Sequence, residues 1–341
     1  MFHKARLITP LFLILLFLAP FCQAKEFPWK KTLHAGQYYV PLDQVKEFYG
    51  FSSLKRSGRQ LTLSSKGVSL TFTSGGQEVM MNGVKFIFSF PVITIGGRHH
   101  LSQTDVTKVV DPILRPNYIK NVKPFDTVII DPGHGGGDPG AVNSLGTEAG
   151  YNLSVALKLR DHLKKYGFKV VMTRDSNRYL TLSQRVAIAN KYRNAIFVSI
   201  HFNAVGAAGR RQARGIETFT LSPMGVAHYG RSVKASDFRE MTGNQQDSAN
   251  IALATAVHWG IIRSLAKHAK IVVPDRGIRR ARFNVLTGVK HPAILIEGGF
   301  MSHHIEAKLI DRPEYQRTMA KAICDAILFY RKATIDRQKS R

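Results

Sequence analysis

Two different patterns of hydrophobic and polar positions divide the chain. Over its first third, apolar residues alternate with polar ones, and turn-forming pairs such as Asn82-Gly83 separate the runs. Alternation of this kind is typical of strands with one buried face. Two further segments, residues 38–45 and 99–106, share one pattern, a short strand that leads into a helix. We therefore predict a small β-rich α+β domain with antiparallel strands over residues 25–120.

After Pro124 the apolar runs lose this alternation, as strands do when both of their faces are buried. Stretches with a helical spacing of apolar residues lie between these runs. The predicted strands are residues 127–130, 169–172, 195–200 and 293–296, and the predicted helices are residues 147–165, 181–193 and 313–331. This alternation predicts an α/β domain over residues 121–341, in which helices cover both faces of a mostly parallel sheet.

The N-terminus has the pattern of a secretory signal peptide. The basic residues Lys4 and Arg6 precede a nine-residue apolar run, Leu11 to Ala19, and small residues follow. Nine apolar residues are too few to span a bilayer, which takes about 20. We predict that residues 1–24 are removed on export, with an uncleaved membrane anchor as the alternative. The protein is then expected in the periplasm or in the cell wall and extracellular space.

Charge narrows the choice of partners. The chain has 49 lysines and arginines against 23 acidic residues, a formal net charge of +26. Such an excess favours anionic partners. An exported protein meets wall polymers and lipid surfaces, so a nucleic acid partner is not expected. Cleavage after residue 24 would leave Cys324 as the only cysteine, and the mature chain then has no disulfide framework.

Polar residues that follow the predicted strands carry the candidate chemistry. His134 follows the first strand, His201 the third, and Glu297 the last, while Glu148 lies in the first turn of a helix. The carboxyl ends of parallel strands form the ligand-binding edge of such a sheet. Two imidazoles and a carboxylate with one position left open suit a catalytic zinc ion, and a further carboxylate can serve as the base.

Three segments, in this order, resemble the zinc-dependent N-acetylmuramoyl-L-alanine amidases of peptidoglycan. They are Asp131-Pro132-Gly133-His134-Gly135-Gly136, Ser199-Ile200-His201-Phe202-Asn203-Ala204 and Glu297-Gly298-Gly299-Phe300-Met301-Ser302. The resemblance spans about residues 127–331. It implies that His134, Glu148 and His201 bind one Zn²⁺ and that Glu297 is the catalytic carboxylate. The implied reaction is hydrolysis of the amide bond between the lactyl group of N-acetylmuramic acid and the L-alanine of the stem peptide.

Residues 25–120 are similar to the stalk domain of copper amine oxidases and of many bacterial wall proteins. The strand and turn pattern and the doubled strand-to-helix segment carry this resemblance, which implies an accessory module. Peptidoglycan and anionic wall polymers are the expected partners, and a protein activator is a further candidate.

Several other residues are candidates for a supporting role. Asp138, Asn203 and Arg185 are expected to contact the substrate or the metal ligands, although an ion pair within the fold is an equal alternative for Arg185. Arg279 or Arg280 are further candidates for contact with the carboxylates of the stem peptide.

Two features depart from the family pattern. Where the family usually has asparagine, this chain has His303, which we expect to cap or orient the segment that follows. The polar stretch from Pro223 to Ser248 is interpreted as a surface loop or, alternatively, as a lid over the cleft.

Two other functions stay open. Another zinc amidohydrolase, such as a carboxypeptidase that acts on wall peptides, would use the same ligands. A wall-binding protein with an inactive metal site belongs to a different class. All four candidate residues are present in this chain, whereas a decayed site is expected to have lost one.

Overall fold

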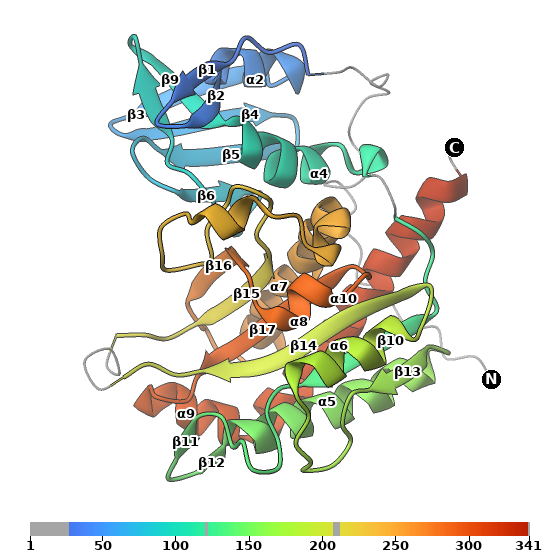
Figure 1. Ribbon diagram of the computed structural model, residues 1–341. Helices are drawn as coiled ribbons and strands as arrows, with labels where there is room; N and C mark the ends of the chain where they lie inside the picture. The colour runs from blue at the N-terminus through green and yellow to red at the C-terminus, as the bar shows by residue number, and fades with distance from the viewer. Residues whose placement is uncertain (1–26, 120–121, 207–211, 340–341) are drawn as a thin grey trace, which may run out of the picture. The chain divides into compact units, whose positions relative to one another are not determined.

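The computed structural model describes residues 27–119, 122–206 and 212–339 of the chain (Figure 1). The predicted signal peptide, residues 1–24, lies outside the described residues. Within the described ranges, no helix is both long enough and apolar enough to cross a bilayer. Cys324 is buried and is not part of a disulfide.

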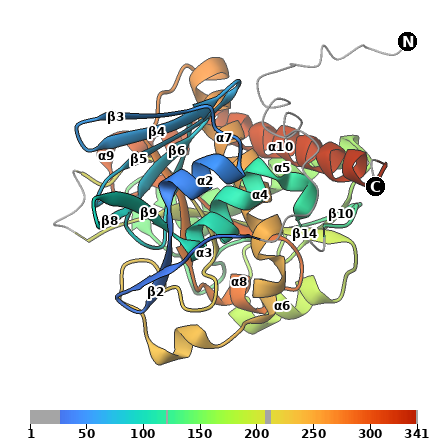
Figure 2. The same cartoon turned by 90° about the horizontal axis from the view of Figure 1, so that it is seen from above.

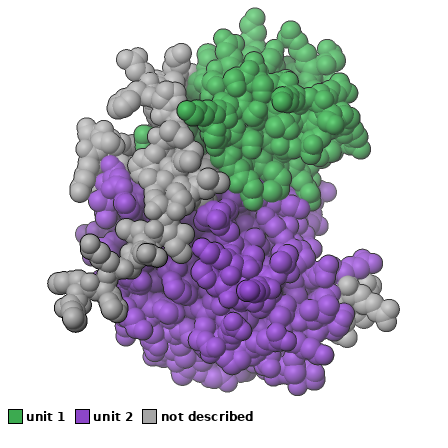
Figure 3. Space-filling view, turned by 180° about the vertical axis from the view of Figure 1, so that it is seen from behind, with its two compact units in different colours: residues 1–83, 90–119 green, residues 84–89, 120–341 purple. Residues whose placement is uncertain are grey.

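The chain folds into two compact units (Figure 3). Unit 1 comprises residues 1–83 and 90–119, and unit 2 comprises residues 84–89 and 120–341. The short segment 84–89 therefore groups with the C-terminal part of the chain, although unit 1 flanks it in sequence. The domain limits given above from the sequence stay predictions.

Unit 1 is rich in antiparallel strands. Its strands are β1 Thr32–His34, β2 Gln37–Pro41, β3 Ser53–Ser57, β4 Gln60–Ser65, β5 Val68–Thr73, β6 Glu78–Met81, β8 Ile93–Ile95 and β9 Arg98–Ser102. One sheet has the order β1-β2-β9-β8, and the other four strands pair antiparallel in the order β3-β4-β5-β6. Leu61 and Leu63 of β4 and Leu70 and Phe72 of β5 are buried, as the alternating pattern predicts.

The repeated strand-to-helix segment is confirmed in both places. Strand β2 leads into α2 (Leu42–Phe48), and β9 leads into a helical stretch made of α3 (Gln103–Asp105), a π-helical turn (Val106–Val110), α4 (Asp111–Leu114) and a 3-10 turn (Pro116–Tyr118). The two strands pair antiparallel, with Val40 opposite Leu101. The two copies of the sequence pattern are therefore also neighbours in one sheet.

Unit 2 is built on a mixed, mostly parallel sheet. Its strands are β7 Val84–Ile87, β10 Thr127–Pro132, β13 Lys169–Met172, β14 Ala195–Asn203, β15 Ile216–Leu221, β16 Asp275–Ala281 and β17 Ala293–Phe300, in the spatial order β13-β10-β14-β17-β15-β16-β7. Neighbouring strands run parallel except β15 with β17. A hairpin of β11 (Val142–Asn143) and β12 (Gly146–Thr147) follows β10. The predicted α/β class is confirmed.

Helices cover both faces of this sheet (Figure 2). On one face, α5 (Glu148–Lys165) and α7 (Asp247–His268) pack against the strands, and α10 (Pro313–Lys339) packs against both helices. On the other face, α6 (Leu182–Asn190) and α8 (Asn284–Gly288) enclose a core that includes Phe197, Phe219 and Leu295. The other helical elements among the described residues of unit 2 are α9 (His304–Asp311) and two 3-10 turns, Ala235–Phe238 and Thr242–Gln246.

Candidate metal centre

Buried arginines hold the loop that carries His134. The backbone φ of His134 is 59°, in the left-handed region that few non-glycine residues adopt. Arg174 donates hydrogen bonds to the carbonyl oxygens of Pro132 (2.9 Å) and Gly133 (2.6 Å), and Arg185 donates one to the carbonyl oxygen of His134 (2.8 Å). The side chains of Arg174 and Arg185, which lie outside this loop, therefore hold the loop that follows β10 in its conformation.

Two glycines leave the space that the cluster needs. A Cβ atom at Gly133 would collide with the ring of His201. A Cβ atom at Gly140 would lie 2.6 Å from Oε2 of Glu148 and 2.7 Å from Cδ2 of His134. A side chain at either position would push these groups apart, which explains why these two positions are glycine.

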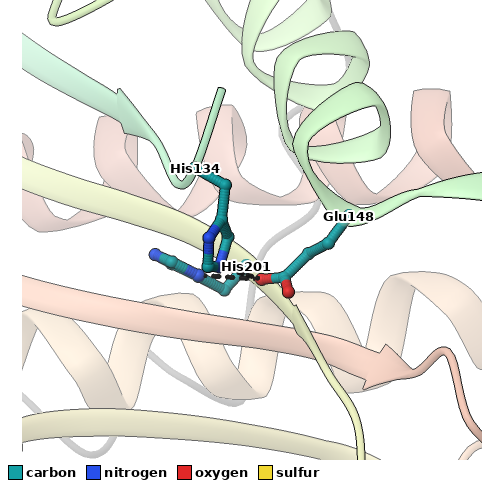
Figure 4. A group of neighbouring side chains, drawn as sticks. All are labelled: His134, Glu148 and His201. Atoms are coloured by element: carbon teal, nitrogen blue, oxygen red, sulfur yellow. Dashed lines mark hydrogen bonds and ion pairs between the residues drawn. The ribbon is translucent and has the colours of Figure 1, made fainter. Parts of the chain in front are cut away.

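Three side chains from three different elements converge at the end of the sheet (Figure 4). Glu148 is the first residue of α5, where Thr147 caps the helix by accepting a hydrogen bond from the backbone N–H of Gly150. His201 lies two residues before the C-terminal end of strand β14. Oε1 of Glu148 lies 3.1 Å from Nε2 of His134 and 2.9 Å from Nδ1 of His201.

Hydrogen bonds with neighbouring residues orient the side chains of this cluster. Nδ1 of His134 lies 2.8 Å from Oδ2 of Asp138, so that Nε2 is turned towards Glu148. Oε2 of Glu148 accepts a hydrogen bond from the backbone N–H of Ala141 (3.0 Å). A histidine that binds a metal usually donates its second N–H to a carboxylate or a carbonyl group in this way. The side chains of His134 and His201 are 26% and 18% exposed, so solvent reaches one side of the cluster.

The cluster stabilises a negative charge on Glu148. Burial alone raises the pKa of this carboxyl, but hydrogen bonds with His134 and His201 outweigh burial and hold the pKa well below its ordinary value. The hydrogen bond with Glu148 raises the pKa of His134, against the opposing effect of burial. Glu148 is therefore ionised at neutral pH.

Glu297 lies beside the cluster on the neighbouring strand. The register pairs it with His201 on β14 and with Glu217 on β15, and side chains paired in this way lie on the same face of a sheet. Although Glu297 as a whole is partly exposed, its Oε2 atom is buried and has no hydrogen-bond partner among the described residues. Burial, then the charges of Glu148 and Glu217, raise the pKa of Glu297 well above its ordinary value.

These residues fit a bound zinc ion. Imidazole and carboxylate ligands bind zinc at about 2.0–2.2 Å in a tetrahedron, which places neighbouring donor atoms about 3.3–3.6 Å apart. The separations of 2.9 and 3.1 Å seen here are slightly shorter than that range, and one ligand atom from each of the three residues lies within 4.8 Å of the other two. The buried and unpartnered Oε2 atom of Glu297 beside them is consistent with a polar occupant on the open side of the cluster.

The structure separates the supporting candidates. Asp138 contacts His134 directly, as described above. Arg185 is buried and pairs with Asp131 at 2.8 Å, so the ion pair within the fold is the alternative observed. Asn203 donates a hydrogen bond to Oε2 of Glu217 (3.1 Å).

The sequence assigns no role to Glu217, which the structure places next to Glu297. Glu217 is only 1% exposed, and its Oε1 atom lies 2.8 Å from Nε of Arg276 and 3.1 Å from Nε of Arg279. Arg280 is buried elsewhere and donates a hydrogen bond to the hydroxyl of Thr220. A single acidic residue in the otherwise uncharged run 216–221 is the signal that points to Glu217.

The two departures from the family pattern have structural accounts. His303 is the N-cap of α9, because its Nδ1 atom accepts a hydrogen bond from the backbone N–H of Glu306 (3.4 Å), and the expected capping role is confirmed.

In the stretch 223–248, Asp237 forms two hydrogen bonds of 2.6 Å with Arg231 and pairs with Arg282 at 2.9 Å. The lid interpretation of this stretch stays a prediction.

The chain belongs to the N-acetylmuramoyl-L-alanine amidase family. Residues 128–328, more than half of the chain, match that family. The AmiC amidase of Neisseria meningitidis serogroup B is 30% identical over 224 residues, which cover 60% of this chain and 52% of that protein. The AmiC amidase of Escherichia coli O6:H1 is 31% identical over 222 residues, with the same coverage of 60% and 52%. The match thus spans about half the length of these two relatives.

Among solved structures, AmiC2 of Nostoc punctiforme is similar to this chain. The two are 30% identical, with a TM-score of 0.48, and the similarity covers 62% of this chain and 98% of that one.

Proposed function

We propose that this protein is a zinc-dependent peptidoglycan amidase. Its reaction would be hydrolysis of the amide bond between the lactyl group of N-acetylmuramic acid and the L-alanine of the stem peptide. Membership of the family supports the class of reaction. The observation that carries the proposal is the convergence of His134 and His201 on one oxygen of Glu148, with the carboxylate of Glu297 on the adjacent strand.

In this proposal His134, Glu148 and His201 hold one zinc ion. When bound, zinc lowers the pKa of water towards about 7 and polarises an amide carbonyl group. Asp138 keeps the ring of His134 in the orientation that turns Nε2 to the ion, since it holds Nδ1 at 2.8 Å.

Glu297 is the proton carrier in this proposal. Its buried Oε2 atom has no hydrogen-bond partner among the described residues, so it is free to accept a proton from water and to deliver that proton to the leaving nitrogen of L-alanine. Glu148 is less suited to this role, because both of its oxygens already accept hydrogen bonds or face the histidines.

The setting of the reaction is also a proposal. The sequence predicts export, and the net charge of +26 favours contact with peptidoglycan and with anionic wall polymers. A protein activator and the accessory role of unit 1 stay predictions.

Product analysis tests the proposed reaction. Purified peptidoglycan is incubated with the zinc-loaded protein, and the soluble products are identified by mass spectrometry. We expect peptides that begin with a free L-alanine, together with glycan chains that keep an unsubstituted lactyl carboxylate. Release of a C-terminal amino acid instead would show a carboxypeptidase, and the absence of any product would leave a wall-binding protein as the better description.

A further inference from the structure

Two arginines next to the catalytic edge share one buried anchor. Nε of Arg276 donates a hydrogen bond to Oε1 of Glu217 (2.8 Å), and Nε of Arg279 lies 3.1 Å from the same oxygen. Nε of Arg279 also donates to the carbonyl oxygen of Arg276 (3.2 Å). Asn203 holds the second oxygen of Glu217 (3.1 Å). This carboxylate therefore fixes both guanidinium groups by one nitrogen each.

Aromatic rings support the same two guanidinium groups. The guanidinium carbon of Arg276 lies 4.9 Å from the ring centre of Phe300, and that of Arg279 lies 4.5 Å from the ring centre of Tyr229. Stacking of this kind restricts the orientation of a planar cation. Each group is thus held by its Nε atom and by one of its flat faces.

The terminal nitrogens of both arginines are left available. Among the residues that the structure describes, no hydrogen bond involves Nη1 or Nη2 of Arg276 or Arg279. The side chains are 28% and 13% exposed, so both arginines are partly accessible to solvent. The group formed by Glu217, Arg276 and Arg279 has a net charge of +1. A fixed, partly desolvated guanidinium with free terminal N–H groups matches the two oxygens of a carboxylate.

The strand register places the two arginines close to the site of the proposed reaction. Glu217 is the register partner of Glu297, and Phe219, two residues later on the same face, is the partner of Arg279. Arg279 is therefore two strands across and two residues along from Glu297, or about 12 Å between Cα atoms at the usual strand spacing and rise. A peptide advances about 3.3–3.6 Å per residue when extended. The two guanidinium groups themselves lie against the carboxylate of Glu217, one strand from Glu297, which brings them within reach of the side chain of the residue after the alanine.

We propose that Arg276 and Arg279 form a carboxylate-binding subsite that recognises the acidic residue following L-alanine in the stem peptide. This subsite rests on the proposed amidase function and adds a specificity to it. Glu217 and Asn203 act as positioning residues, and the arginines contact the substrate. The alternative is that the two arginines only neutralise the buried charge of Glu217.

Two matched substrates separate these alternatives. They are N-acetylmuramoyl-L-alanyl-D-glutamate and its diamide, in which both glutamate carboxylates are capped. We expect the wild-type protein to prefer the acid, mainly through a lower KM. Arg279→Gln should reduce that preference, measured as the ratio of the two kcat/KM values, by about tenfold or more, which corresponds to one bidentate contact of roughly 1.5–3 kcal/mol. Arg279→Lys keeps the charge but cannot bind a carboxylate through two parallel N–H groups. Its preference for the acid should therefore lie between those of Arg279→Gln and the wild-type protein.

The control variant is Arg263→Gln, which removes the same charge from an exposed arginine that stacks on Trp259 of α7. It should leave the ratio unchanged at fixed ionic strength. An equal loss on both substrates in Arg279→Gln, or no change of the ratio, would overturn the subsite and leave a structural role. Thermal denaturation of each variant shows whether the fold has been kept.

A binding measurement keeps this test separate from the amidase proposal. If the wild-type protein cleaves neither substrate, the proposed reaction fails, but the dipeptide L-alanyl-D-glutamate can still be titrated calorimetrically into the zinc-loaded protein. Binding that weakens at least tenfold in Arg279→Gln and is unchanged in Arg263→Gln would support the subsite. Equal affinity in all three proteins, or no binding, would overturn it.

Discussion

Two buried glutamates in unit 2 each gather two nitrogen atoms around one carboxylate oxygen. At Glu148 these are imidazole nitrogens at 2.9 and 3.1 Å, and at Glu217 they are arginine Nε atoms at 2.8 and 3.1 Å. Imidazole loses its proton near neutral pH and then binds metals, whereas guanidinium keeps its proton. Similar geometry around a carboxylate therefore gives a proposed metal centre in one place and a fixed pair of cations in the other.

The largest effect is expected from the histidines at Glu148. His201→Ala removes one of three proposed protein ligands, so zinc content and hydrolysis of peptidoglycan should both fall to background. Metal analysis of the purified variant and product release measure the two quantities. The exposed His268 on α7 supplies the control, and His268→Ala should keep both. Full zinc content in His201→Ala would place the metal elsewhere.

A smaller loss of zinc affinity is expected when a residue that only supports a proposed ligand is changed. Asp138→Asn keeps the shape of the side chain but weakens the contact with Nδ1 of His134, which is 2.8 Å long. Changes at such supporting residues cost roughly 10–100-fold in metal affinity or activity. Competition with a chelator of known affinity measures the change in zinc affinity. An unchanged affinity with unchanged turnover would show that the contact does not orient His134.

Replacing the carboxylate of Glu217 by an amide should lower the stability of the fold and leave metal binding unchanged. Glu217→Gln leaves two arginines without their anion and weakens a buried charged network, so we expect a loss of about 1–3 kcal/mol in the free energy of unfolding. Urea denaturation of the zinc-loaded protein measures this loss. Zinc content should stay at the wild-type level. Loss of zinc in this variant would contradict the distinction between the two glutamates.

The sequence predicts the cluster of His134, Glu148 and His201 better than it predicts the cluster of Glu217, Arg276 and Arg279. Strands β10, β14 and β17 are short apolar runs, and the residues that follow parallel strands necessarily share one edge. Strand β16 has the sequence Asp275-Arg276-Gly277-Ile278-Arg279-Arg280-Ala281, and three arginines conceal its strand character. Its pairing with β15, and so the encounter of Arg279 with Glu217, depends on long-range packing that periodicity does not reveal.

The role of Arg185 shows a second limit of the sequence. Its charge and its place in a helix suit a surface contact with substrate and an internal ion pair equally well. Only the fold shows that Arg185 is 3% exposed and reaches Asp131 and the carbonyl oxygen of His134. Burial of an arginine depends on which partners the tertiary structure supplies.

The smallest effect is expected in the stretch 223–248, where Asp237 is the anchor. The hydrogen bond with Arg231 lowers the pKa of Asp237 to about 2, against the opposing effect of burial. Because the folded pKa lies below the unfolded value of about 3.9, the stabilisation is present above about pH 4 and is lost as the pH falls towards 2.

The variant Asp237→Asn should therefore lower the thermal midpoint at pH 7 and approach the wild-type midpoint between pH 4 and 2. Asp161→Asn, at the exposed pair with Arg160, is the control and should change the midpoint little at either pH. A difference between Asp237→Asn and wild type that persists undiminished at the lowest pH would show that ionisation of Asp237 is not what holds the stretch.

The central claim is that Glu148 binds the metal and Glu297 moves the proton. The most direct test measures zinc content and turnover together in Glu148→Gln and Glu297→Gln, with both variants shown to be folded. We predict that Glu148→Gln loses zinc and activity together. Glu297→Gln should keep its zinc while turnover falls on the order of 100-fold or more. Retained turnover in Glu297→Gln would contradict the account, and loss of zinc from that variant would make Glu297 a ligand instead.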